Sequence, residues 1–314
     1  MRVSELGEQG IIELLTERLP RPVAEIWIGD DAAVFPAPSE RLVLTTDTMV
    51  EGVDFDLSYA SGADVGWKAL AVNVSDIAAM GAEPSKAVTT LCLPPDTEVS
   101  FVDDMITGLV EAASGYGVDL VGGDISTARE IAVGIALVGS GSRAPWLRSG
   151  ARPGDSICVT GALGGSYTGF QALRADPRAT GESVRRHLRP AARLSEARAL
   201  SGVAISAAID VSDGLAIDLG RLLRASDAGC EIDSGEIPVD TAASATLEAA
   251  LYGGEDFELL FTLPPSEVDE AVSLVARCGT VVTEIGRVTS GAAMLDGLPL
   301  DRHEERSWDH LRNR

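Results

Sequence analysis

Leu44-Thr45-Thr46-Asp47-Thr48 carries an apolar, strand-like run onto a carboxylate, and four other stretches of the chain repeat this pattern. They are Ile28-Gly29-Asp30-Asp31-Ala32-Ala33, Asn73-Val74-Ser75-Asp76, Val121-Gly122-Gly123-Asp124 and Ile209-Asp210-Val211-Ser212-Asp213-Gly214. A carboxylate beside buried apolar sequence is unfavourable unless it is paired or binds a cation. One such aspartate is usually a turn residue or a helix cap. Five of them, all with small neighbours, predict a ligand site built where strands break into tight turns.

The donor atoms in these stretches are carboxylate and hydroxyl oxygens. Hard oxygen ligands without dedicated His or Cys favour Mg²⁺ or Ca²⁺ over zinc. The chain has no Gly-x-x-x-x-Gly-Lys-Ser/Thr phosphate loop, and its two lysines, Lys68 and Lys86, stand against 23 arginines. A P-loop kinase is therefore excluded. The pattern predicts a site with several magnesium ions that handles phosphates.

The composition sets limits on the class of protein. The 314 residues are 45% hydrophobic and 23% charged, which is typical of about two globular domains. A formal net charge of −23 disfavours nucleic acid and anionic membranes as partners. Without a bilayer-spanning apolar run or a signal segment, we expect a cytoplasmic protein. The four cysteines form no CxxC pair, the three histidines have no metal-ligand spacing, and neither Ser-His-Asp nor Cys-His chemistry has sequence support.

Strand-like and helix-like segments alternate along the chain, which predicts an α/β fold with mixed sheets in two domains, residues 1–143 and 144–314. The boundary is a turn-rich stretch without periodicity at residues 141–155. On a helix expected over residues 64–81, Asn73 and Asp76 share one face and are expected to point into a cleft. We also expect one basic helix over residues 184–201 and a hairpin over residues 251–263. The Gly-rich turn at residues 161–165 is interpreted as tight packing, with phosphate binding at the following helix as the alternative.

Six motifs in one order resemble the thiamine-monophosphate kinase family, which belongs to the ATP-binding superfamily of aminoimidazole ribonucleotide synthetase and selenophosphate synthetase. They read GDDAA from residue 29, TTDTMVEGVDF from 45, NVSDIAAMGA from 73, GGDIS from 122, IDVSDGL from 209 and GGEDFELL from 253. The resemblance runs from about residue 7 to residue 308. It implies ATP-dependent phosphorylation of thiamine monophosphate to thiamine diphosphate, with Mg²⁺ as the metal and ATP as the co-substrate.

The resemblance also implies a fold and a set of site residues. The fold is that of aminoimidazole ribonucleotide synthetase, two α/β domains with the active site in the cleft between them. Its N-terminal domain binds ATP and magnesium and pairs in a homodimer. The implied magnesium ligands are Asp30, Thr45, Thr46, Asp47, Asp76, Asp124, Asp210 and Asp213. The implied nucleotide contacts are Gly123, Asp124, Arg148 and Ser212, and the implied substrate contacts are Asp54, Glu255 and Trp308. Catalysis is assigned to Asp47, Asp76, Asp124 and Asp213.

Two positions depart from the family pattern. The family motif usually reads EGVHF, and this chain has Asp54 at the histidine position. Asp54 is expected to hold the cationic thiamine rings or an extra Mg²⁺; the alternative is that it lies outside the site. The ending Ser307-Trp308-Asp309-His310 matches the family only in part. Trp308 either stacks on the thiazolium cation or closes a hydrophobic edge.

The implied chemistry suits these residues. A phosphate monoester has a second pKa of about 6 and is mainly a dianion at pH 7, so this acceptor needs no general base. Charge neutralisation and in-line positioning by several Mg²⁺ ions would then carry catalysis. Residues 1–28 contain neither the Cys nor the Lys of selenophosphate synthetases, and the motifs at 45–55 and 253–260 disfavour aminoimidazole ribonucleotide synthetase activity. A non-enzymatic calcium-binding protein is disfavoured because no D-x-[DN]-x-[DN]-G loop is present.

Overall fold

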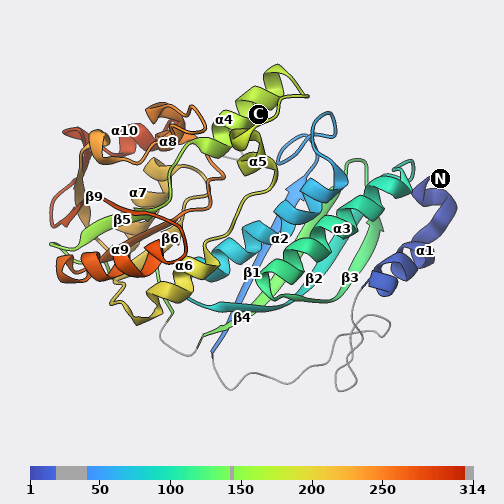
Figure 1. Cartoon of the computed structure of the whole chain (residues 1–314), viewed down its shortest axis with the longest axis horizontal. Coiled ribbons are helices and arrows are strands. Elements are labelled where there is room, and N and C mark those ends of the chain that lie inside the picture. Colours follow the sequence, from blue (N-terminus) through green and yellow to red (C-terminus); the bar gives the residue numbers. More distant parts are fainter. Residues whose placement is uncertain (19–40, 142–144, 308–314) are drawn as a thin grey trace. The chain divides into compact units, whose positions relative to one another are not determined.

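The computed structural model describes residues 1–18, 41–141 and 145–307 (Figure 1). The chain divides into two compact units, Met1–Ile77 with Ala82–Arg143, and Ala78–Gly81 with Ala144–Arg314. Each unit combines helices with one sheet that contains both parallel and antiparallel strand pairs. The predicted α/β fold with mixed sheets is therefore confirmed. Within the described ranges, no helix has both the length and the hydropathy needed to cross a membrane.

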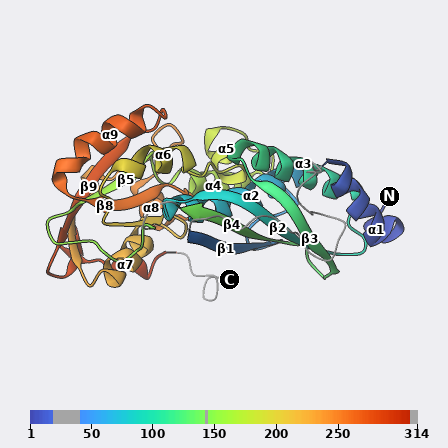
Figure 2. The same cartoon turned by 90° about the horizontal axis from the view of Figure 1, so that it is seen from below.

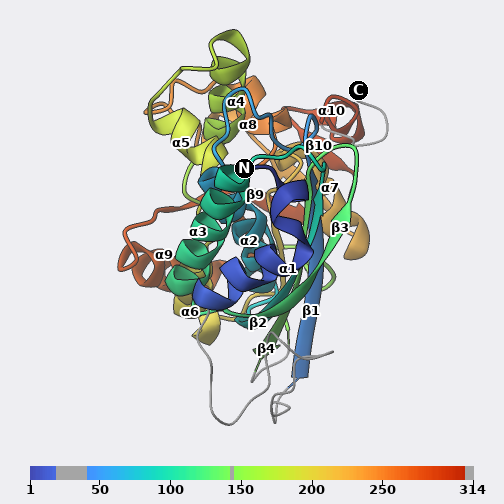
Figure 3. The same cartoon turned by 90° about the vertical axis from the view of Figure 1, so that its right-hand side faces the viewer.

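The first unit is a four-stranded sheet with two long helices on one face. Its elements are α1 (Val3–Arg18), β1 (Arg41–Val50), α2 (Gly62–Ala79), β2 (Glu83–Leu93), α3 (Val99–Tyr116), β3 (Asp119–Thr127) and β4 (Ala132–Gly141). The strand order is β1-β4-β2-β3, in which only β2 and β3 are parallel. Helices α2 and α3 lie side by side on this sheet (Figures 1 and 2). Gly66 permits their close approach, because a Cβ there would come within 2.0 Å of the Met105 carbonyl oxygen. Helix α1 packs beside α3 (Figure 3), where Arg18 forms an ion pair with Asp103.

The two faces of this sheet differ in burial. On β4, alternate residues Val133, Ile135 and Leu137 are buried on the face that carries the helices. Successive side chains of a strand point to opposite faces. On the opposite face, Leu42 and Leu44 of β1 are 59% and 71% exposed, and other apolar side chains stand beside them, because Val138 pairs with Leu44. The first unit thus keeps one face of its sheet open and apolar.

The second unit is built on a seven-stranded sheet of order β11-β10-β7-β9-β5-β8-β6. Its strands are β5 (Ser156–Thr160), β6 (Ala207–Asp210), β7 (Gly229–Ile232), β8 (Leu259–Leu263), β9 (Val282–Thr289), β10 (Ala293–Leu295) and β11 (Leu298–Pro299). Its α-helices are α4 (Gly165–Ala175), α5 (Glu182–Leu188), α6 (Leu194–Ala199), α7 (Leu215–Ala225), α8 (Leu247–Tyr252), α9 (Val268–Ala276) and α10 (Asp301–Glu304), and short 3₁₀ turns are η1 (Leu200–Gly202), η2 (Ser234–Glu236) and η3 (Pro265–Glu267). Strands β5, β6 and β8 are buried throughout, and they form the core together with α7.

Two local predictions are wrong. The basic helix expected over residues 184–201 is two short helices, α5 and α6. Pro190 lies between them, and proline has no N–H to continue a helix and clashes with the preceding turn. The hairpin expected over residues 251–263 is instead the end of helix α8, an irregular segment and strand β8. Thr246 starts α8 by accepting a hydrogen bond from the Ala249 N–H, so the apolar residues that follow belong to a helix.

Candidate active site

Three of the five aspartate stretches lie inside regular elements. Asp47 lies within β1, which continues to Val50, Asp76 lies in α2, and Asp124 lies within β3, which continues to Thr127. The expectation that a tight turn follows the strand-like run is therefore wrong for these three carboxylates. In the second unit, Asp210 is the last residue of β6, and Asp213 lies in the turn before α7. Strand pairing with β4 keeps β1 extended past its polar residues, and pairing with β2 does the same for β3.

Helix α2 holds the middle of β1 through two polar residues. Thr45 donates its hydroxyl hydrogen to the Asp76 carboxylate. The Asn73 carbonyl oxygen accepts the Asp47 N–H at 3.1 Å, and the Asn73 amide donates to the Ala69 carbonyl at 2.9 Å. Asn73 is fully buried, so the expectation that it points into a cleft is wrong. Its contacts instead fix the backbone of Asp47, while Asp76 stays partly exposed.

The sheet register sets the spacing of the first-unit motifs. Asp47, Ile135, Thr89 and Gly123 lie in one row across β1, β4, β2 and β3. Neighbouring strands are about 4.8 Å apart, so Asp47 and Gly123 are about 14 Å apart across the sheet. Asp47 and Asp124 are both exposed, and the Thr46 hydroxyl donates to the Ile135 carbonyl at 2.9 Å.

Asp54 lies in the turn that follows β1. Its carboxylate accepts the Val50 N–H at 2.7 Å, and its backbone carbonyl accepts a hydrogen bond from the Lys68 ammonium at 3.1 Å. Lys68 is buried in α2. Asp54 therefore closes the turn between its own segment and the end of β1, and its side chain is still partly exposed.

In the second unit, the motifs at residues 209–215 and 253–260 lie side by side. The Glu255 N–H donates to the Ser212 carbonyl at 2.7 Å, and the Phe257 N–H donates to the Val211 carbonyl at 2.9 Å. Gly254 allows this approach, because a Cβ there would be 2.5 Å from the Ser212 carbonyl oxygen. Glu255 has a φ of +67°, which non-glycine residues adopt at an energetic cost. These two motifs therefore form one local site.

Arg221 of α7 pairs with two carboxylates beside this site. Its Nη1 atom is 2.6 Å from Asp213 Oδ2 and 2.6 Å from Asp218 Oδ1. The other oxygen of Asp218 accepts the N–H groups of Ser212 and Asp213, both at 2.9 Å. Burial raises the pKa of Asp218 to about 6. Sequence reasoning missed Asp218 and Arg221, although the i, i+3 spacing of this acid and base was a usable signal for a pair on a helix.

The Gly-rich turn before α4 is occupied by a carboxylate of the chain itself. Asp256 accepts the Gly164 N–H at 2.6 Å and the Ser166 N–H at 3.2 Å, at the N-terminus of α4. Loss of solvation raises the pKa of Asp256 to about 7. A carboxyl group of the chain at this helix terminus takes the place that a phosphate would use, which fits the packing interpretation of the turn.

Glu258 lies deeper in the second unit. It is 1% exposed, and it accepts hydrogen bonds from Arg193 Nε at 2.6 Å and from the Thr160 hydroxyl at 2.7 Å. Burial raises the pKa of Glu258. In the acidic run at 255–258, Glu255 and Asp256 are partly exposed and Glu258 is buried, and the hydrogen bonds of Asp256 and Glu258 stabilise the fold.

The remaining predicted residues are placed as follows. Arg148 is exposed, and its backbone carbonyl accepts a hydrogen bond from Ser226. Asp30 and Trp308 lie outside the described residues. In the part of the chain that the structure describes, no three His, Cys, Asp or Glu side chains come together in a metal-binding group.

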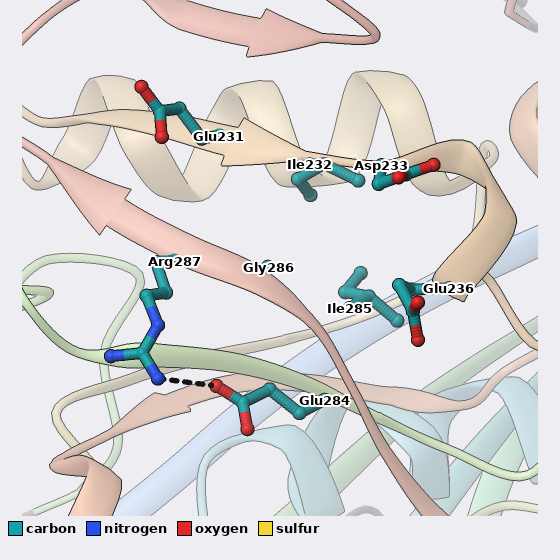
Figure 4. Close-up of a pocket in the computed structure, with 8 residues that line it drawn as sticks. All are labelled: Glu231, Ile232, Asp233, Glu236, Glu284, Ile285, Gly286 and Arg287. Carbon is teal, nitrogen blue, oxygen red and sulfur yellow. Dashed lines mark ion pairs between the residues drawn. The ribbon is translucent and has the colours of Figure 1, made fainter.

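A hollow of about 550 Å³ lies on the second unit between β7, η2 and β9 (Figure 4). Glu231, Asp233, Glu236 and Glu284 line it, and Arg287 is 3.7 Å from Glu284. None of the predicted site residues lines this hollow. We attribute the acidic lining of this hollow to the high negative charge of the chain as a whole. The candidate site is instead the one that the motif residues form.

Two domain families match the sequence. Residues 29–140 match the AIR synthase related protein, N-terminal domain, and residues 152–294 match the AIR synthase related protein, C-terminal domain. The thiamine-monophosphate kinase of Rhodopirellula baltica is 40% identical over 300 residues, which cover 90% of this chain and 89% of that protein.

Solved structures give the same result. A thiamine-monophosphate kinase from Stenotrophomonas maltophilia has a TM-score of 0.82 and 30% identity, covering 92% of this chain and 96% of its own. A structure described as AaThiL complexed with AMPPCP and TMP has a TM-score of 0.76 and 38% identity, covering 95% of this chain and 96% of its own. The Escherichia coli hydrogenase maturation protein HypE shares the fold, with a TM-score of 0.79 at 19% identity.

Proposed function

The chain belongs to the thiamine-monophosphate kinase family, and we propose on this basis that it transfers the γ-phosphoryl group of ATP to the phosphate of thiamine monophosphate. The products are thiamine diphosphate and ADP. One observation carries the proposal: a relative complexed with AMPPCP and TMP aligns over 95% of this chain at 38% identity. In AMPPCP a methylene group replaces the β–γ bridging oxygen of ATP, so it occupies the place of the phosphoryl donor beside the acceptor.

The acceptor determines what the chain must supply. Its phosphate is mainly a dianion at pH 7 and attacks without losing a proton to the protein. The difficulty is the approach of two polyanions in a protein with a net charge of −23. Positioning and charge neutralisation are therefore the main catalytic contributions.

The donor atoms of the motifs suit Mg²⁺, which prefers carboxylate and other hard oxygen ligands. We assign this role in the first unit to Thr45, Thr46, Asp47, Asp76 and Asp124, together with Asp30, and in the second unit to Asp210 and Asp213. Mg²⁺ held by these residues would neutralise the phosphate charges and orient the transferred group. Asn73 supports this arrangement because its hydrogen bond to the Asp47 N–H fixes the strand that carries Asp47.

The register argues for more than one metal ion. Asp47 and the Gly123-Asp124 pair are separated by about three strand spacings, or about 14 Å. Bonds between Mg²⁺ and oxygen are about 2.0–2.1 Å long, so one ion cannot be shared by both carboxylates. By the same register Asp124 pairs with Thr90, one row from Asp47, and projects from the opposite face of the sheet, so the two carboxylates would hold separate ions.

The organic parts of the two substrates are assigned to other residues. We propose that Gly123, Asp124, Arg148 and Ser212 contact the nucleotide, and that Asp54, Glu255 and Trp308 contact thiamine monophosphate. Exposure of the Arg148 side chain and partial exposure of Glu255 are consistent with ligand contact. Catalysis then depends most on Asp47, Asp76, Asp124 and Asp213.

We further propose a cytoplasmic homodimer, because ATP is available there and the open sheet face of the first unit suits self-association. Leu42, Leu44 and Val88 are 59%, 71% and 41% exposed on that sheet. Apolar surface of this kind is stabilised when a partner covers it. Sedimentation analysis of wild type and of Leu44→Asp tests the pairing: a shift toward monomer in the variant is expected, and a monomeric wild type would rule it out.

The direct test is incubation of the purified protein with Mg-ATP and thiamine monophosphate, followed by chromatography. Thiamine diphosphate and ADP should form in equal amounts. Parallel reactions with the substrates of the sister synthetases are the controls. Turnover with one of those substrates and none with thiamine monophosphate would overturn the proposal.

Magnesium dependence tests the multi-ion site separately. At saturating Mg-ATP, the rate should continue to rise with free Mg²⁺, because further ions load the carboxylates. A rate that is fully described by the concentration of Mg-ATP would count against additional metal sites.

A further inference from the structure

His187 lies beside Glu255 in the second unit, and none of the sequence motifs includes it. Its Nδ1 atom is 3.0 Å from Glu255 Oε2 and 3.4 Å from the Ser166 hydroxyl oxygen. The ring packs on Phe170, with 5.3 Å between ring centroids, and His187 is 4% exposed. Three separate segments, α4, α5 and the 253–260 motif, therefore bring a serine, a histidine and a glutamate together.

These three residues do not form a hydrolytic triad. In such a triad, the nucleophile contacts one ring nitrogen and the carboxylate contacts the other, so that the ring passes a proton between them. Here both the Ser166 hydroxyl and the Glu255 carboxylate face the same nitrogen, Nδ1. The shorter distance belongs to Glu255. The main contact therefore joins the buried His187 ring to the Glu255 carboxylate.

Glu255 is fixed on several sides and is still accessible. Its backbone has a φ of +67°, and its N–H is bonded to Ser212. The next residue, Asp256, is anchored at the N-terminus of α4. The Glu255 side chain is 30% exposed, whereas the His187 side chain is 5% exposed. A carboxylate held from the protein interior and open toward solvent is suited to bind a cationic ligand group.

We propose that His187 is a positioning residue that orients the Glu255 carboxylate toward the cationic ring system of thiamine monophosphate. This inference rests on the proposed function, and it adds a residue that determines affinity for the organic cation. With Nδ1–H donating to Oε2, Glu255 keeps one orientation and loses less rotational freedom when the substrate binds. His187 itself touches neither substrate.

The test compares three single variants by steady-state kinetics. His187→Leu removes the donor, and it should raise KM for thiamine monophosphate about five- to tenfold while KM for ATP and kcat stay within about twofold. His187→Asn restores a neutral N–H donor near the same position and should recover most of the affinity. Phe170→Leu is the packing control, which should lower Tm and leave KM for thiamine monophosphate unchanged.

A double-variant cycle decides whether His187 acts through Glu255. If it does, His187→Leu combined with Glu255→Gln should be no worse than Glu255→Gln alone. Additive effects, or an unchanged KM in His187→Leu, would overturn the inference. If His187→Leu does not fold, calorimetric binding of thiamine monophosphate to His187→Asn and to Glu255→Gln replaces the cycle. We expect near-wild-type affinity in His187→Asn and weak affinity in Glu255→Gln. Equal affinities in the two variants would contradict the inference. Failure of the proposed function is distinct, because wild type itself would then form no thiamine diphosphate.

Discussion

The acidic motifs of the two units look alike in the sequence and differ in the structure. In the first unit, Asp47 and Asp124 are exposed on strands of an open sheet. In the second unit, Asp218, Asp256 and Glu258 accept hydrogen bonds from the backbone or from arginine. The first group is exposed to solvent. The second group is held by hydrogen bonds within the protein.

We propose that this difference separates carboxylates that bind ligands from carboxylates that stabilise the fold around the site. A charge removed from water needs a partner, so a buried acid costs stability when its partner is lost. Removal of an exposed acid beside a phosphate site changes stability little, but it reduces turnover. Substitution of the exposed first-unit acids should therefore lower the rate, whereas loss of the groups that bind Asp218, Asp256 or Glu258 should lower stability.

The largest effect on stability is expected at the Arg193–Glu258 pair. Arg193→Met leaves Glu258, whose side chain is 2% exposed, without its cation. The free energy of unfolding should fall by about 3–5 kcal/mol, as is typical when one partner of a buried pair is removed. Urea denaturation measures it. Arg185→Met is the matched control, because Arg185 pairs with Glu182 at the surface and should change stability by about 0–1 kcal/mol. Equal losses in both variants would contradict the distinction.

The largest effect on rate is expected at Asp47. Asp47→Asn keeps the size of the side chain and removes one charge from the proposed phosphate site. We expect kcat to fall about 10²–10³-fold with an unchanged circular dichroism spectrum, as for loss of a preorganised electrostatic contact. Asp104→Asn on the exposed face of α3 serves as the control and should turn over normally. Near-normal turnover in Asp47→Asn would return Asp47 to an ordinary strand residue.

Asp256 should make the stability of the second unit depend on pH. Its pKa is raised to about 7 in the folded protein, against about 3.9 in an unfolded chain. Between these values the native state holds a proton that the unfolded state has released, so this contribution to stability falls as the pH rises. The slope is at most about 1.4 kcal/mol per pH unit.

Asp256→Asn removes this titration. The stability of the variant relative to wild type should therefore increase from pH 4 to pH 7 and level off above pH 7. Denaturation at a series of pH values measures the difference, with Asp104→Asn as the control for loss of an exposed acid. A difference that does not vary with pH would mean that the Asp256 carboxylate stays ionised in the fold.

The sequence predicted the fold class because strand and helix periodicities are local properties of the chain. It misplaced the helix break at Pro190 and the start of α8 at Thr246, where single residues override the periodicity of their neighbours. It named Asp213 and Glu255 as candidate site residues and missed the side chains that contact them, Arg221 and His187. Arg221 and His187 reach these carboxylates because of how α7 and α5 pack, and residue spacing along the chain does not reveal that packing.

The smallest effects are expected at Asp54. Its carboxylate makes a structural contact and is also proposed to contact the substrate, so one residue combines the two roles that are separate elsewhere. It accepts the Val50 N–H at 2.7 Å and so closes a turn. Asp54→Asn keeps an acceptor for that N–H and removes the charge, whereas Asp54→Ala removes both.

If the charge holds the thiamine cation or a metal ion beside it, both variants should raise KM for thiamine monophosphate several-fold and leave KM for ATP nearly unchanged. Asp54→Ala should additionally lower Tm, because the Val50 N–H loses its partner. Steady-state kinetics with each substrate varied, together with thermal denaturation, separates the two roles. A normal KM in Asp54→Asn with a lowered Tm in Asp54→Ala would make Asp54 a turn residue, and the place of the family histidine would then have no substrate contact in this protein.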